Sequence, residues 1–259
     1  MLITVIRDFI KDKFSMKRVK YVIANWKMNG NLASLSLVRH INNHLRKNKV
    51  KSPKVIICPP FTLLGTFAAV KSMNLTFGAQ NIHKLDHGAY TGEISSSMVK
   101  DVKAKYVIIG HSERRSYQNE DVNELREKIL IALNQKLKVI FCIGETHDQI
   151  KKRKSILQNQ LKSLPKNFSH KNIIVAYEPV WAIGTGLTPT ISEIDKIHSN
   201  IRNMLTKYVG KNSDKISILY GGSVNSKNAS EILYLKNVDG ALVGGASLNA
   251  REFCKIIDS

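Results

Sequence analysis

Ile173-Ile174-Val175-Ala176 is a short run of apolar residues, and a carboxylate, Glu178, follows two residues after it. A continuous apolar run of this length is typical of a strand that is buried on both faces, as in a parallel sheet. A carboxylate at the tip of such a strand is costly to bury unless it is paired or functional. The stretch therefore indicates both a fold class and the place of a functional site.

Similar apolar runs occur eight times along the chain. We predict strands at Tyr21–Asn25, Val55–Cys58, Leu75–Ala79, Tyr106–Ile109, Val139–Cys142, Ile173–Ala176, Ile216–Tyr220 and Ala241–Val243. Most intervening stretches have apolar residues at helical spacing, as at Leu125, Ile129 and Leu133. Strands that alternate with helices pair in parallel through right-handed crossovers. Eight such units predict an α/β fold, a closed (β/α)8 barrel with its active site at the C-terminal strand ends.

An open doubly wound sheet is the alternative, but its Gly-x-Gly-x-x-Gly fingerprint is missing after the first strand. The 259 residues are 43% hydrophobic, and no linker-like stretch divides them. One domain over residues 16–259 is therefore expected. Residues 1–15 precede an internal methionine, Met16, and form a dispensable extension in this interpretation, from an upstream start or a cloning extension. The extension's near-helical apolar spacing predicts a surface helix, and its acidic residues argue against a signal or transit peptide.

The formal net charge of +20 raises the question of nucleic-acid binding. The lysines are scattered along helical stretches without a recognised motif or interleaved aromatic residues, so we expect no nucleic-acid partner. No apolar run reaches the about 20 residues of a membrane helix, and no membrane partner is expected. Cys58, Cys142 and Cys254 are far apart with apolar neighbours, which predicts buried thiols in a reducing cytoplasm and no zinc site.

Three polar segments follow predicted strands. Asn25 and Lys27 are two residues apart, so at strand spacing both point to one face while Trp26 points away. In isolation, Lys27 fits a surface charge, a Schiff-base nucleophile or an anion stabiliser, and the surface charge is the commonest of the three. His111, after the fourth strand, fits a structural histidine as well as a catalytic one. Together with Glu178 they suggest proton abstraction beside a carbonyl, with a base, an electrophile and a cation for the growing charge.

Glycine-rich segments follow the seventh and eighth strands, at 221–222 and 244–245. Either pair is compatible with an ordinary turn, but both together at this end of a barrel favour a phosphate site, because glycines let backbone N–H groups approach an anion. The segment 179–185 lies between a proline and glycines, which predicts a closing lid; a rigid loop is the alternative. Thr190 and Glu193 match a capping box at the start of the next helix.

The segments Ala24–Gly30, Gly110–Arg115 and Ala176–Gly186, in this order, resemble the triosephosphate isomerase family, and the likeness extends from Met16 to the C-terminus. The resemblance implies a TIM barrel and an isomerase of glycolysis and gluconeogenesis. It implies the interconversion of dihydroxyacetone phosphate and glyceraldehyde 3-phosphate through an enediolate, without metal or organic cofactor.

The resemblance also implies roles for individual residues. Glu178 is the base, His111 is a neutral electrophile whose pKa a helix N-terminus lowers, as described for the family, Lys27 is the electrostatic partner, and Asn25 helps to hold the substrate. The remaining implied positions are Gly184, Ser223, Gly244 and Gly245 for the phosphate, Ser112 and Glu113 in support, and Thr91, Glu93 and Arg114 at a homodimer interface.

Two rival functions remain at this point. A Schiff-base aldolase or an epimerase would use the same kind of barrel, but an aldolase lysine is desolvated near the barrel centre. A non-catalytic binding protein would have lost Glu178, His111 or Lys27, and all three are present. Cytoplasmic localisation is expected with the isomerase interpretation.

Overall fold

The structure is a computed structural model that describes residues 18–50, 52–70, 72, 74–166, 168–183 and 188–259. The predicted extension, 1–15, lies outside these residues, and so does Gly184.

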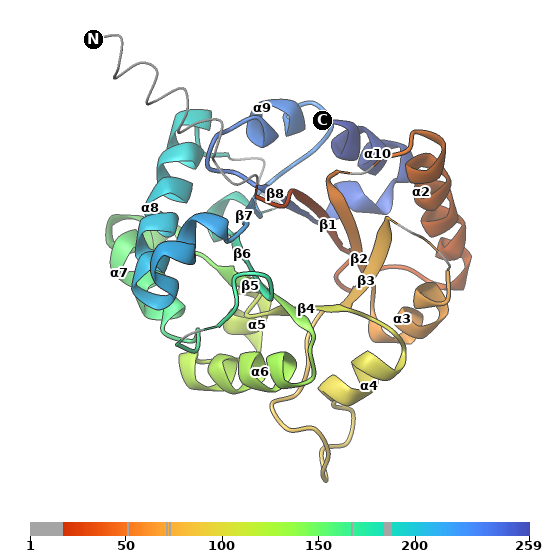
Figure 1. Cartoon of the computed structure of the whole chain (residues 1–259), viewed down its shortest axis with the longest axis horizontal. Coiled ribbons are helices and arrows are strands. Elements are labelled where there is room, and N and C mark those ends of the chain that lie inside the picture. The colour runs from red at the N-terminus through yellow and green to blue at the C-terminus, as the bar shows by residue number, and fades with distance from the viewer. Residues whose placement is uncertain (1–17, 51, 71, 73, 167, 184–187) are drawn as a thin grey trace.

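Eight parallel strands close into one barrel in sequence order, with β1 paired to both β2 and β8 (Figure 1). Their bounds are β1 Tyr21–Asn25, β2 Lys54–Cys58, β3 Leu75–Ala79, β4 Tyr106–Ile109, β5 Lys138–Ile143, β6 Ile173–Tyr177, β7 Ile218–Tyr220 and β8 Gly240–Val243. The predicted barrel is confirmed. The start of the seventh strand was predicted two residues too early, because the Ile216 N–H bonds to the Ser213 carbonyl of the preceding turn.

Helices surround the barrel as an outer ring (Figure 1). Their bounds are α2 Leu35–Lys47, α3 Phe61–Ala68, α4 Ser96–Asp101, α5 Ser112–Tyr117, α6 Val122–Asn134, α7 Arg153–Leu161, α8 Ile191–Val209, α9 Ala229–Leu233 and α10 Ala250–Asp258. The capping box at the start of α8 is confirmed, since the Thr190 side chain accepts from the Glu193 N–H and the Glu193 carboxylate accepts from the Thr190 N–H.

All strands except β3 contribute to both of two apolar layers, and β3 contributes to the outer layer alone. In β1, Val22 and Ala24 pack outward against the helices, whereas Tyr21 and Ile23 belong to a cluster inside the barrel. Because both faces of the sheet are covered, the strands consist of continuous apolar runs and not of alternating ones. The three cysteines are free and buried, as predicted.

The C-terminal ends of the parallel strands meet at one rim of the barrel, so the polar residues that follow them come together there. At this rim the segment between β3 and α4 projects from the barrel (Figure 1). No helix in the described part of the chain is long and apolar enough to cross a membrane.

Candidate active site

One cavity of about 300 Å3 lies at this rim, and residues that follow β1, β4, β6, β7 and β8 line it. Seven of the residues singled out in the sequence contribute to its wall: Asn25, Lys27, His111, Glu178, Ser223, Gly244 and Gly245. Barrel closure thus brings the predicted acid–base residues and the predicted phosphate segments into one site.

Glu178 lies directly after β6 and is 1% exposed. Its Oε1 is 2.9 Å from His111 Nε2, and its Oε2 accepts a hydrogen bond from the Ser112 N–H at 2.9 Å. Burial alone raises the pKa of Glu178, but His111, Arg115 and the Ser112 N–H outweigh it and lower the pKa. The carboxylate is therefore held ionised in an almost dry position, which suits a base.

The backbone around Glu178 requires glycine at two places. A Cβ on Gly144 would lie 1.7 Å from the Glu178 carbonyl oxygen, and one on Gly221 would lie 3.0 Å from the Glu178 Cγ. Gly144 therefore lets its strand end approach the backbone of Glu178, and Gly221 lets the next one approach the side chain.

His111 is the N-cap of α5, and its Nδ1 accepts a hydrogen bond from the Glu113 N–H at 3.3 Å. A neutral ring that accepts at Nδ1 carries its proton on Nε2 and donates from there. Burial lowers the pKa of His111, but the charge and hydrogen bond of Glu178 outweigh it, so the pKa is raised. The lowered pKa implied by the resemblance is therefore wrong for this arrangement, because the Glu178 carboxylate lies against Nε2.

Lys27 lines the cavity and is partly exposed. Its Nζ is 2.6 Å from Glu113 Oε1, and its backbone has a left-handed φ of 54°. The Gln80 amide stabilises this turn by donating to the carbonyls of Lys27 and Cys58, both at 2.9 Å. Trp26 points the other way and packs edge-on against Phe67, which confirms the predicted alternation.

The glycine pair after β8 opens a short 3-10 helix, Gly245–Leu248. The first N–H groups of a helix have no partner within it, so they attract an anion. A Cβ on Gly245 would meet no atom within 4 Å, so the space beside this backbone is open. In the segment after the adjacent strand β7, Ser223 Oγ donates to the Ala182 carbonyl at 2.7 Å. The arrangement can hold a phosphate at the end of the cavity away from β4.

The start of the predicted lid is anchored. Residues Val180–Ala182 form one 3-10 turn after Pro179. The Trp181 indole donates to Glu145 Oε1 at 3.2 Å, and the Val180 N–H donates to the Glu145 carbonyl at 3.0 Å.

Sequence reasoning missed three supporting residues. Arg115 donates to the Cys142 carbonyl at 2.7 Å and helps to lower the pKa of Glu178. Gln80 holds Lys27, as described above. Glu145 also accepts from Tyr177 and Arg153. Glu145 follows β5 as Glu178 follows β6, so the same signal, a carboxylate after an apolar strand, was available for it.

The residues assigned to a dimer interface lie apart from the cavity. Thr91 and Glu93 are exposed on the projecting segment. Within the chain, Arg114 Nε is 2.5 Å from Glu120 Oε1, so its predicted pairing with a partner's Glu93 would be additional to this contact.

Comparisons with known proteins agree over almost the whole chain. The triosephosphate isomerase family profile matches residues 20–259. The chain is 44% identical to a triosephosphate isomerase of Rhizobium meliloti (strain 1021) over 239 residues, which cover 91% of this chain and 93% of the relative. It is 45% identical to that of Zygosaccharomyces bailii over 250 residues, covering 94% and 99%. The crystal structure of triosephosphate isomerase from Bartonella henselae matches with a TM-score of 0.85 and 40% identity, covering 92% and 98%.

Proposed function

The chain belongs to the triosephosphate isomerase family, and on this premise we propose how its own residues carry out the reaction. It interconverts dihydroxyacetone phosphate and glyceraldehyde 3-phosphate, a step of glycolysis and gluconeogenesis. The observation that carries the residue assignment is the single cavity in which Glu178, His111 and Lys27 meet the glycine segments after β7 and β8.

Glu178 is the base. It takes a proton from the hydroxymethyl carbon of dihydroxyacetone phosphate, and the C–H electron pair becomes the carbon–carbon double bond of the enediolate. The same carboxyl returns the proton to the neighbouring carbon. The hydroxyl proton of the first carbon passes by way of His111 to the oxygen of the second carbon, which leaves the aldehyde. Its position supports this role, because the carboxylate is buried at the cavity wall and, when it turns from His111, loses the contact that lowers its pKa.

His111 is the electrophile and Lys27 the fixed positive charge. When Glu178 turns to the substrate, His111 loses the partner that raises its pKa, while the Glu113 N–H still donates to Nδ1. The ring is then neutral and donates its Nε2 proton to the carbonyl oxygen. The ammonium of Lys27 offsets the negative charge that grows on the enediolate, and the Asn25 amide holds the same end of the substrate.

The phosphate binds to backbone N–H groups of Gly244 and Gly245 and to Ser223. Gly184, outside the described residues, adds its N–H when the lid closes. The hydrogen bond from Ser223 to Ala182 supports this coupling, because it joins the phosphate segment to the lid. Ser112 and Glu113 support the site by holding Glu178 and Lys27.

The enzyme acts as a homodimer in the cytoplasm in this proposal, and it needs no metal or organic cofactor. The projecting segment with exposed Thr91 and Glu93 supports a dimer, since an exposed protrusion of this kind is suited to insertion into a partner. Sedimentation at several concentrations tests the stoichiometry.

A coupled assay in both directions, followed by turnover in D2O, tests the chemistry. Proton transfer through a carboxylate exchanges with solvent, so the product gains deuterium at the carbon that receives the proton; a hydride shift would carry no deuterium. Borohydride added with substrate should leave the protein mass unchanged, whereas a Schiff-base aldolase would be trapped on a lysine.

A further inference from the structure

A second cavity, of about 280 Å3, lies at the opposite end of the barrel, where the strands begin. Its wall includes Arg18, Lys54, Lys138, Lys171 and Lys215, together with His170. Lys54 and Lys138 are the first residues of β2 and β5, and the others lie just before β1, β6 and β7. Parallel strands all start at one end of the barrel, so five cations far apart in sequence converge there.

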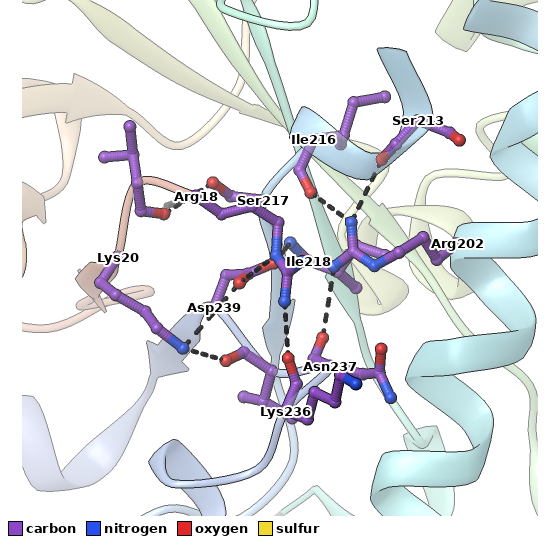
Figure 2. A network of polar contacts seen from close by, with 12 residues as sticks. Arg18, Lys20, Arg202, Ser213, Ile216, Ser217, Ile218, Lys236, Asn237 and Asp239 are labelled. Carbon is purple, nitrogen blue, oxygen red and sulfur yellow. Dashed lines mark hydrogen bonds and ion pairs between the residues drawn. The ribbon is translucent and has the colours of Figure 1, made fainter. Parts of the chain in front are cut away.

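The positive charge of this cluster is not neutralised by carboxylates in the described part of the cavity wall. Among the described residues that line the cavity, none is acidic. The neighbouring Asp239 is fully buried and already accepts from Arg18 at 2.6 Å, from Arg202 at 2.8 Å and from the Ile218 N–H at 3.0 Å (Figure 2). Its charge is therefore engaged by two guanidinium groups, only one of which belongs to the cavity wall.

The pKa shifts of two wall residues, Lys138 and His170, reflect the surplus of positive charge. Burial lowers the pKa of Lys138, and the neighbouring Lys54 and Lys105 lower it further. Burial likewise lowers the pKa of His170, together with Lys215 and Lys171. Like charges held this close repel one another, and an anion placed among them relieves the repulsion.

We propose that this N-terminal mouth of the barrel is a binding site for a compact polyanion of the oligophosphate class. A cavity of this size takes a small ligand, and cations that approach from five strand ends favour several charges gathered in one short chain. A free oligophosphate and the triphosphate of a nucleotide share this chemistry. The site is separate from the catalytic cavity and does not depend on the proposed catalytic roles.

Inorganic tripolyphosphate is the first probe, titrated calorimetrically into the full chain at low salt. Saturating glycerol 3-phosphate fills the catalytic cavity throughout. We expect one tripolyphosphate per chain, with an affinity at least about tenfold above that of monophosphate and falling as salt is added. The ring protons of His170 should shift in the NMR spectrum when the ligand binds. ATP should bind with a similar affinity if the phosphate chain is what the site recognises.

The Lys54→Gln/Lys138→Gln double variant removes two cations from the wall and should weaken binding by about tenfold or more. Lys162→Gln/Lys255→Gln makes the same change in net charge on exposed lysines outside the cavity and should retain binding. Circular dichroism and isomerase activity establish that both variants fold.

Three results would overturn the proposal. The first is an equal loss of affinity in the two double variants. The second is loss of tripolyphosphate binding when glycerol 3-phosphate is present. The third is tighter binding of a single-stranded oligonucleotide through Lys54 and Lys138, which would make this end a nucleic-acid surface instead.

Discussion

Oε1 of Glu178 lies 2.9 Å from Nε2 of His111, so the proposed base and the proposed electrophile contact each other directly. Each group satisfies the other while it is buried, which avoids the large cost of an unpaired buried charge. In the proposed mechanism the substrate separates them, because each contacts a different atom of the substrate. This relationship makes the protonation of His111 dependent on the position of Glu178.

The first prediction follows from that dependence. Burial lowers the folded-state pKa of His111, but Glu178 outweighs burial, so the pKa is raised. Protonated His111 therefore stabilises the fold fully below the unfolded pKa of about 6.5, and this contribution is lost as pH rises through the higher folded value. The pKa of Glu178 is lowered, so its carboxylate stays ionised in this pH range.

Urea unfolding of His111→Gln should show a larger loss of stability at pH 6 than at pH 9. The same substitution at an exposed histidine, His40→Gln, gives the loss of stability expected when the histidine has no buried partner. Equal losses at both pH values would mean that His111 is neutral throughout.

Shortening the base tests its reach. Glu178→Asp retracts the carboxylate by one methylene and should lower kcat by about 100-fold with little change in KM, since a misplaced base chiefly affects the transition state. Steady-state kinetics in both directions measure this. The matched change Glu231→Asp, on the exposed face of α9, should leave kcat as it is. An unchanged kcat for Glu178→Asp would remove Glu178 from the role of base.

Lys27→Ala should damage both kcat and KM, because the cation meets the negative substrate in the ground state and the enediolate in the transition state. We expect a fall in kcat/KM of about 100-fold or more. Glu113→Gln removes the carboxylate 2.6 Å from Lys27 Nζ but keeps the ammonium, and should cost far less. If the two variants lost activity equally, orientation by Glu113 and not the charge of Lys27 would be the decisive factor.

Residues 1–15 should be dispensable. β1 begins at Tyr21, and Arg18 already anchors the chain through Asp239 at 2.6 Å. A chain that begins at Met16 should therefore keep its melting temperature and its kcat, measured by calorimetry and the coupled assay. Arg18→Gln is the contrast and should lower the melting temperature, since it removes a partner of a buried carboxylate. A large fall on removing residues 1–15 alone would assign the extension a structural role.

Deleting 182–185 and joining the ends should leave a folded barrel with much lower isomerase activity. An enediolate beside a phosphate can expel that phosphate, so an open site should release a larger share of methylglyoxal. Chromatographic analysis of the products measures that share. Normal isomerisation without methylglyoxal would show that the segment is a rigid loop and not a lid.

Local sequence patterns determined the elements and the polar residues at their ends. The eight apolar runs predicted the strands, and the capping box predicted the start of α8, because both depend on residues close in sequence. The positions of Lys27, His111 and Glu178 after three strands also placed them at one rim, since parallel strands end on the same side.

Only the tertiary structure decided which of these side chains touch. The hydrogen bond between Glu178 and His111 and the support of Lys27 by Gln80 each join residues from different strand ends. The bonds from Tyr177 and Trp181 to Glu145 do the same. Their distances depend on barrel closure and strand register, which no local period encodes. The raised pKa of His111 follows for the same reason, because the carboxylate that outweighs burial comes from another strand.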